Sequence, residues 1–127
     1  MTKILITGGA GNVGGALARK LVENPNYFVV VVDDLSTGST SKLPSKELSN
    51  WSFVNGDVNN YTSISEIMLT NHFDYVFHYA AVVGVKRTQE NPIMVLNDIE
   101  GIKNVLQLSK NSSVKRVFFS SSSEVYG

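Results

Sequence analysis

The chain has 127 residues, of which 43% are hydrophobic and 17% are charged, a composition typical of one soluble globular domain with one core. Eleven basic and eleven acidic side chains give a formal net charge of zero. The sequence therefore has no excess of basic residues that would indicate a nucleic-acid partner. The absence of cysteine excludes a disulfide framework and a thiolate zinc site, and no run of about 20 apolar residues predicts a membrane span. These features favour a cytoplasmic protein that binds a small molecule.

Apolar runs alternate with helical patterns along the whole chain. The runs predict strands at 3–7, 27–32, 51–55, 75–79 and 115–121, and the periodic segments predict helices at 12–23, 62–69 and 92–110. Alternation of this kind is typical of the α/β class, with a doubly wound parallel sheet and helices on both faces. The segment 36–50 has no steady period and is predicted to be a surface connection with a little helix.

Two apolar stripes at helical spacing are predicted to face the core. The stripe of the first helix contains Val13, Ala16, Leu17 and Leu21, and that of the long helix contains Val95, Ile99, Ile102 and Leu106. The two histidines, His72 and His78, show no metal-ligand spacing, so no metal is expected. His78 lies within an apolar strand and is predicted to be a core histidine, not a proton shuttle.

The loop after the first predicted strand has the spacing Gly8-x-x-Gly11-x-x-Gly14 and leads directly into a helix. Glycines at this spacing permit a tight turn, a close approach of the backbone to a pyrophosphate, and close packing of the next helix. The helix that begins near Asn12 directs its free N–H groups and positive dipole end at the same point. Asp33 follows Gly14 by nineteen residues, at the end of the second strand. Together these features predict a Rossmann-type dinucleotide site.

The carboxylate of Asp33 also predicts which dinucleotide binds. It accepts hydrogen bonds from both ribose hydroxyls but repels a 2′-phosphate, and no arginine follows it in the next loop. NAD is therefore favoured over NADP. The alternative for Asp33 and Asp34 is a pair of solvated turn carboxylates. For Asp57 the alternative is a helix N-cap or an Asx turn, which is compatible with a binding role.

Five blocks of the chain, taken in order, resemble the extended short-chain dehydrogenase/reductase family, and more narrowly its nucleotide-sugar epimerases, dehydratases and decarboxylases. The blocks are residues 7–14, 32–34, 56–58, 78–81 and 120–127. The resemblance implies that the glycines hold the pyrophosphate, that Asp33 binds the adenosine ribose, and that Asp57 and Val58 flank the adenine. The cofactor-binding residues that it implies are Gly8, Gly11, Asn12, Val13, Gly14, Asp33, Asp57, Val58, Ala80, Ala81 and Ser120.

The same resemblance implies a catalytic residue and a substrate region near the end of the sequence. Ser122 matches the serine or threonine that binds the hydroxyl being oxidised, although four consecutive serines also fit a plain polar loop. Contacts to the sugar or its diphosphate are implied for Lys86, Arg87, Ser123 and Glu124. The alternatives are solvated cations at 86 and 87 and a carboxylate that caps a turn at 124.

Three departures from the family pattern narrow the interpretation. The 4,6-dehydratases usually carry Asp-Glu where this chain has Ser123-Glu124, which argues against dehydration and is similar to glucuronate decarboxylases and some epimerases. Asp98 stands where relatives have asparagine, with Asn97 before it. No tyrosine of the chain is followed four residues later by lysine, so the family's Tyr-x-x-x-Lys base is missing.

The sequence therefore predicts an incomplete NAD-binding domain over 1–127, with a parent protein about two to three times as long. The parent is expected to be an NAD-dependent nucleotide-sugar epimerase that oxidises a ring carbon transiently and acts as a homodimer, while the 127 residues alone catalyse nothing. A nucleotide-glucuronate decarboxylase or a 4,6-dehydratase is the enzymatic alternative. A non-catalytic dinucleotide-binding module and a folding unit without a function of its own remain open.

Overall fold

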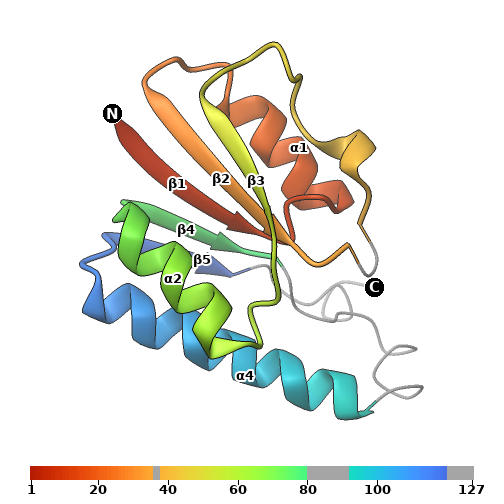
Figure 1. The fold of residues 1–127 in the computed structure, drawn as a ribbon, viewed down its shortest axis with the longest axis vertical. Coiled ribbons are helices and arrows are strands. Elements are labelled where there is room, and N and C mark those ends of the chain that lie inside the picture. Colours follow the sequence, from red (N-terminus) through yellow and green to blue (C-terminus); the bar gives the residue numbers. More distant parts are fainter. Residues whose placement is uncertain (36–37, 80–91, 120–127) are drawn as a thin grey trace.

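The computed structural model describes residues 1–35, 38–79 and 92–119, and the side chains of all of these except 92–100. Five parallel strands in this part form one sheet in the order β3-β2-β1-β4-β5 (Figure 1). The strands are β1 (Thr2–Thr7), β2 (Tyr27–Asp33), β3 (Trp51–Asn55), β4 (Tyr75–His78) and β5 (Arg116–Phe119). The chain adds strands outward from β1 to β3 and then crosses back to β4. This reversal beside β1 is the point at which open parallel sheets bind ligands, at the carboxyl ends of their strands.

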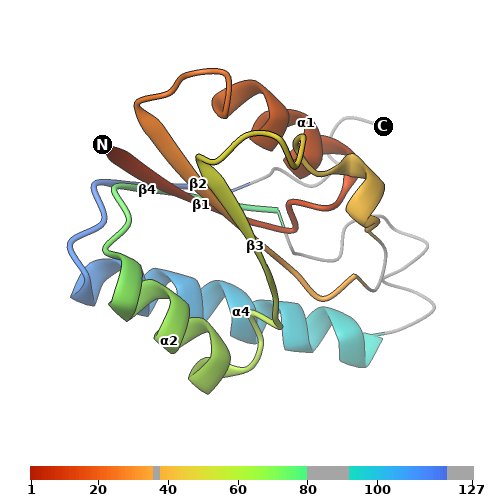
Figure 2. The same ribbon diagram turned by 45° about the horizontal axis from the view of Figure 1, so that its top comes forward.

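Helices cover both faces of the sheet, so the predicted α/β class with a Rossmann-type parallel sheet is confirmed (Figure 2). The helix α1 (Asn12–Leu21) and the short 3-10 helix η1 (Thr40–Lys42) lie on one side, and α2 (Tyr61–Asn71) and α4 (Pro92–Asn111) lie on the other. The short helix falls in the segment that the sequence predicted to be a connection with a little helix. The predicted strands and helices are present, with bounds that differ by a few residues.

The core has two halves because successive side chains of a strand point to opposite faces. On the α2 and α4 side, the buried strand residues include Leu5, Val30, Val32 and Val76. On the α1 side they include Ile4, Ile6, Val29 and Val31. Both faces are covered, which explains why the middle parts of β1 and β2, residues 4–6 and 28–32, are apolar without polar alternation.

The predicted core stripe of α1 is partly wrong. Leu17 and Leu21 pack against the core, but Val13 is 62% exposed and Ala16 is also exposed. The buried residues of this helix are instead Gly14, Gly15 and Ala18. A pattern that counts only apolar side chains overlooks glycines. In α1, Gly14 and Gly15 form part of the helix face that packs most closely against the rest of the chain.

The stripe predicted for α4 is wrong at its far end, since Leu106 is 46% exposed and Ile102 is only half-buried. The side chains of Val95 and Ile99 lie outside the described residues. The described inward face consists of Gly101, Asn104, Val105, Leu108 and Ser109. Three of these five are not apolar side chains, so hydrophobic periodicity indicated a face rotated away from the true one.

Candidate functional site

The glycine loop between β1 and α1 is a compact turn whose shape depends on glycine at two points. Gly8 has a positive φ of 70°, a backbone conformation that residues other than glycine rarely adopt. Its N–H donates to Val32 O at 2.7 Å, and its carbonyl accepts from Gly11 N at 3.1 Å. A Cβ at Gly14 would lie 2.5 Å from that same carbonyl oxygen. The loop therefore brings the start of α1 against the end of β1 with no room for a side chain.

The start of α1 is open to an anion. Gly11 is the N-cap, and no side chain caps the first N–H groups, nor does the first turn contain an acidic residue. The first backbone donors of a helix have no partner within the helix, and the helix dipole adds partial positive charge there. Asn12 and Val13 are exposed in this first turn. The arrangement suits a phosphate or pyrophosphate.

Asp33 ends β2 and joins the glycine loop to the loop that follows β2. The residue is 8% exposed, with Oδ2 accepting from Ala10 N at 2.9 Å and Oδ1 accepting from Leu35 N at 2.7 Å. The Ala10 carbonyl accepts in turn from Ser39 N at 2.9 Å. The solvated alternative for Asp33 is therefore wrong, because the carboxylate is buried and bonded. Each oxygen retains further acceptor capacity, so a ribose hydroxyl can still bind.

The loop after β3 lies beside Asp33, whose carbonyl accepts from Gly56 N at 3.2 Å. Asp57 is exposed and forms the predicted Asx turn, with Oδ1 accepting from Asn59 N at 2.9 Å. The N-cap of α2 is Asn60, whose Oδ1 accepts from Ser63 N at 3.2 Å, so the cap alternative for Asp57 is wrong. Val58 is buried in the core. The turn presents an oriented carboxylate at the carboxyl edge of the sheet.

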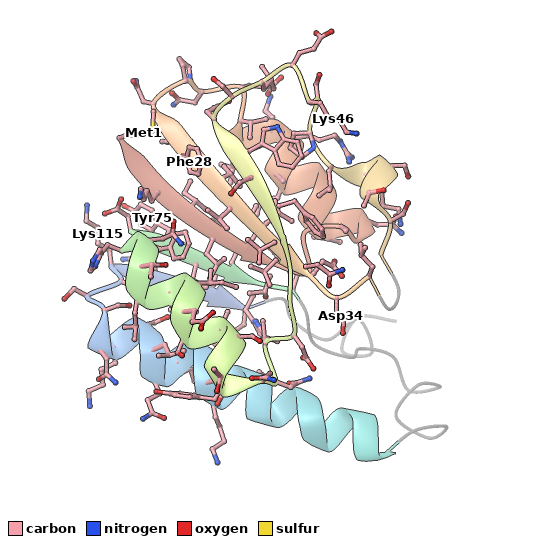
Figure 3. The ribbon with its side chains drawn as sticks, in the orientation of Figure 1. Met1, Phe28, Asp34, Lys46, Tyr75 and Lys115 are labelled. Atoms are coloured by element: carbon pink, nitrogen blue, oxygen red, sulfur yellow. The ribbon has the colours of Figure 1, made fainter. Side chains whose placement is uncertain are left out.

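The structure thus brings together one group of the predicted cofactor residues at this edge. They are Gly8, Gly11, Asn12, Val13, Gly14, Asp33, Asp57 and Val58. Figure 3 shows Asp34 at the same edge, at the opposite end of the sheet from Met1 and Phe28. The other predicted site residues lie outside the described residues. They are Ala80, Ala81, Lys86, Arg87, Ser120, Ser122, Ser123 and Glu124.

His78, at the end of β4, is a buried residue paired with β1. It is 2% exposed, and its Nδ1 lies 2.7 Å from Thr7 Oγ1. The Thr7 hydroxyl oxygen also accepts from Tyr79 N at 3.1 Å, and the tautomer of the ring decides whether Thr7 Oγ1 or His78 Nδ1 is the donor in their pair. The other ring nitrogen, Nε2, is buried without a hydrogen-bond partner. Burial lowers the pKa of His78 to about 4, so the ring is neutral at pH 7, as expected of a core histidine.

The low pKa of His78 predicts a loss of stability in mild acid. The unfolded ring takes up a proton near pH 6.5, whereas the folded ring stays neutral until about pH 4. Because the unfolded state binds more protons in this window, the unfolding free energy should fall by about 3 kcal/mol between these pH values. Urea unfolding at several pH values, on wild type and His78→Asn, measures this contribution. Asparagine keeps an acceptor for Thr7 and does not titrate, so parallel curves for the two proteins contradict the prediction.

Several residues that fix this edge were missed by sequence reasoning. A Cβ at Gly9 would lie 2.3 Å from Val31 Cγ1, and one at Gly38 would lie 2.8 Å from Ala10 O. Thr7 links β1 to β4 through His78, and Asn104 on α4 donates to Val58 O at 3.0 Å. The glycine at 9 was visible in the sequence as part of a glycine cluster. The other three act through long-range contacts, for which a single sequence gives no signal.

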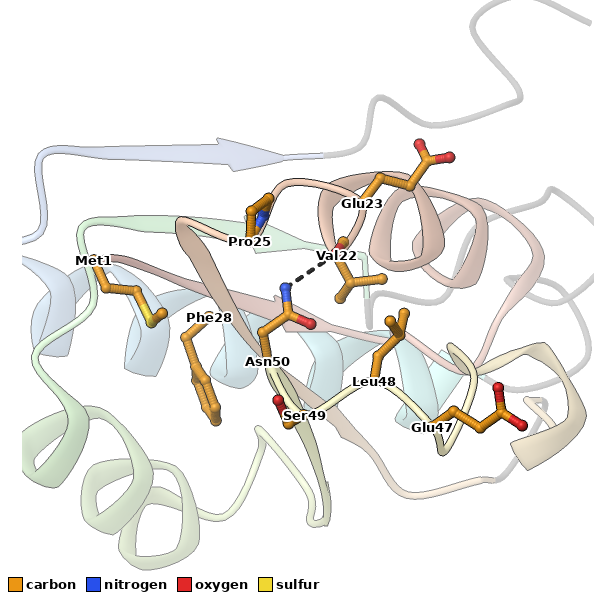
Figure 4. A pocket seen from close by; sticks show the side chains of 9 residues that line it. All are labelled: Met1, Val22, Glu23, Pro25, Phe28, Glu47, Leu48, Ser49 and Asn50. Carbon is orange, nitrogen blue, oxygen red and sulfur yellow. Dashed lines mark hydrogen bonds between the residues drawn. The ribbon is translucent and has the colours of Figure 1, made fainter.

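A hollow of about 480 Å³ lies at the other end of the sheet. Figure 4 shows its lining, in which Asn50 donates to Val22 O. The same amide also donates to Asn24 O and Tyr27 O. Asn50 therefore joins the end of α1 to the start of β2, which is a structural role. The hollow lies at the amino ends of the strands, away from the glycine loop.

Neither a metal cluster nor a membrane helix is found in the part of the chain that the structure describes. No group of three or more potential ligand side chains among residues 1–35, 38–79 and 101–119 is arranged to hold a metal ion. The helices of the described segments are not long and apolar enough to cross a membrane.

Comparison with known proteins gives matches along nearly the whole chain. The model of the NAD dependent epimerase/dehydratase family matches residues 4–127. A UDP-N-acetyl-alpha-D-glucosaminuronate decarboxylase of Bacillus cytotoxicus is 38% identical over 126 residues, which are 98% of this chain and 38% of the relative. The chain therefore spans well under half the length of this relative.

Solved structures match the fold equally well. The UDP-glucose 4-epimerase of Thermotoga maritima, solved with UDP-glucose, superposes with a TM-score of 0.86 at 32% identity over 94% of this chain and 38% of that one. The UDP-glucose-4-epimerase of Stenotrophomonas maltophila has a TM-score of 0.84 at 28% identity, over 100% of this chain and 39% of that one. The latter structure contains NAD and formylated UDP-arabinopyranose.

Proposed function

Because the chain belongs to the NAD-dependent epimerase/dehydratase family, we propose that its 127 residues form the NAD-binding part of a nucleotide-sugar 4-epimerase. The observation that carries this proposal is the meeting of an uncapped helix terminus, a buried carboxylate and an oriented Asx turn at one edge of the sheet. The similarity to UDP-glucose 4-epimerases supports the reaction class.

The residues at this edge fit a dinucleotide. A Cβ at Gly14 would press on the backbone of Gly8 and Gly9, so glycine at this position preserves the turn that leads into α1. The free N–H groups of α1 suit a pyrophosphate. In this proposal Asp33 accepts from the adenosine ribose, and Asp57 and Val58 flank the adenine. Asp33 also disfavours a 2′-phosphate by charge repulsion, which favours NAD over NADP. When bound, NAD supplies an acceptor that takes a hydride from a sugar ring carbon and later returns it.

The roles of the remaining predicted residues belong to the same proposal. Ser122 orients the sugar hydroxyl and polarises the developing carbonyl, while Ala80, Ala81 and Ser120 border the nicotinamide half. Lys86, Arg87, Ser123 and Glu124 contact the sugar or its diphosphate. The 127 residues contain no Tyr-x-x-x-Lys, so the general base for the hydroxyl proton is not expected among them. The chain alone should therefore bind NAD without turning over a sugar.

The decisive experiment is a product assay on the protein in its full native length. UDP-glucose and UDP-N-acetylglucosamine are supplied separately with NAD, and the products are separated by ion-pair chromatography. Epimerisation gives the corresponding galacto sugar with no net NADH at 340 nm, because the hydride is returned. Failure of the purified protein to bind NAD, or to interconvert any nucleotide sugar, contradicts the proposal. The 127-residue chain serves as the matched control that binds without turnover.

A decarboxylase is the second candidate, favoured by the 38% identity to a glucosaminuronate decarboxylase and by the Ser123-Glu124 pair. The same protein is incubated with UDP-glucuronate and UDP-N-acetylglucosaminuronate, and released carbon dioxide is measured. Carbon dioxide release together with absent epimerisation replaces the 4-epimerase proposal with this one.

A further inference from the structure

The Asx turn after β3 is connected to α4 through a single peptide group. The carbonyl of Val58 accepts from Asn104 Nδ2 at 3.0 Å, and the N–H of the same peptide, that of Asn59, donates to Asp57 Oδ1 at 2.9 Å. The amide, the peptide and the carboxylate thus form one continuous hydrogen-bond chain. Such chains polarise each member and strengthen its bonds. The orientation of the exposed Asp57 carboxylate is therefore coupled to a side chain 47 residues later in the sequence.

Asn104 is an unusual residue for its position. It is 5% exposed, and its neighbour Val105 and Leu108 one turn later belong to the apolar core. An amide in such surroundings is costly unless it is hydrogen-bonded. A leucine would fill the space at lower cost if packing were its only purpose. The hydrogen bond from Asn104 to Val58 O is the interaction that offsets the cost of burying the amide.

A second contact brings α4 onto the same turn. Gly101 lies three residues before Asn104, on the same face of the helix, and a Cβ there would lie 2.4 Å from Asn59 Oδ1 and 3.0 Å from Val58 Cγ2. Glycine inside a helix destabilises it by about 1 kcal/mol relative to alanine. Close approach to the turn is the structural reason for accepting glycine here, so two residues of α4 are specialised for contact with residues 58 and 59.

We propose that Asn104 is a positioning residue for adenine recognition. It holds the Val58–Asn59 peptide in the orientation that points the Asp57 carboxylate toward the exocyclic amine of the adenine ring. This inference rests on the proposed function, since it requires a dinucleotide at this edge of the sheet. Asn104 itself is buried behind the turn and acts through Asp57.

The test compares NAD with its hypoxanthine analogue, in which a carbonyl oxygen replaces the adenine amine. A carboxylate favours the amine and is repelled by the oxygen, so the full-length wild-type protein should prefer NAD by about tenfold or more in Kd. Asn104→Leu should reduce this ratio to within about threefold of unity. Ser109→Ala is the matched control, because Ser109 is another buried polar residue of α4 whose Oγ has no hydrogen-bond partner. It should keep the wild-type ratio.

Each outcome has a defined meaning. If wild type binds neither dinucleotide, the proposed function itself fails. If wild type binds both equally, or if Asn104→Leu discriminates as well as wild type, the positioning role is overturned. Should Asn104→Leu not fold by circular dichroism, Asn104→Ala takes its place. In an Asp57→Ala background, loss of the Asn104 amide should leave the ratio unchanged, whereas a merely structural role would not tie its effect to Asp57.

Discussion

Replacement of Gly14 by alanine is expected to lower the unfolding free energy by roughly 2 kcal/mol and to weaken NAD binding at least about 100-fold. The new Cβ would lie 2.5 Å from Gly8 O and 2.9 Å from Gly9 Cα. Both are backbone atoms, so no side-chain rotation relieves the overlap. Separation of α1 from the loop breaks the turn that aligns its N–H groups with the pyrophosphate. This loss exceeds the gain of about 1 kcal/mol that alanine brings to a helix.

Urea unfolding and titration with NADH measure the two effects of Gly14→Ala. Gly56→Ala is the matched control, because its Cβ would meet its nearest neighbour at 3.6 Å, an ordinary contact. The control should unfold within about 0.5 kcal/mol of wild type. Wild-type affinity for NADH in Gly14→Ala would show that the pyrophosphate does not lie over this loop.

Asp33→Asn is expected to destabilise the protein by about 1–3 kcal/mol and to reduce NAD affinity by roughly 10- to 100-fold. The two oxygens of Asp33 accept from Ala10 N and Leu35 N. An asparagine can accept only one of these bonds and turns an N–H group toward the other donor. The ribose hydroxyls also lose a charged acceptor. Removal of the negative charge should at the same time narrow the preference for NAD over NADP.

Competition titrations with NAD and NADP, together with thermal unfolding, separate these contributions. Asp34→Asn is the matched control, since it removes the same charge from the exposed neighbouring residue. The control should keep the preference for NAD. Equal effects of the two substitutions would mean that only net charge matters at this edge, and the assignment of the ribose to Asp33 would then be wrong.

The predicted elements illustrate how far local sequence determines a fold. Residues 4–6 of β1 and 28–32 of β2 are apolar at consecutive positions because both faces of the sheet are covered, and this marks them as central parallel strands. The glycine loop was equally predictable, because the backbone at Gly8 requires a positive φ. Asp33 was placed by its spacing alone, at the end of β2.

The inward faces of α1 and α4 could not be obtained in this way. Hydrophobic periodicity selected Val13 and Leu106, both of which are exposed, and overlooked Gly101 and Asn104. Glycines and amides become inward-facing only where a particular partner approaches closely. For Gly101 and Asn104 that partner is the turn at 58–59, more than 40 residues away in sequence.

The sequence by itself therefore determined the class of fold, the order of its elements and the position of the glycine loop, because these follow from local conformational preference and from the burial of consecutive apolar residues. Only the tertiary structure decided that Asp33 joins two loops, that His78 is buried against Thr7, and that α4 supports the Asp57 turn. These are contacts between segments distant in the chain. Their energy depends on geometry across the sheet, which no local pattern encodes.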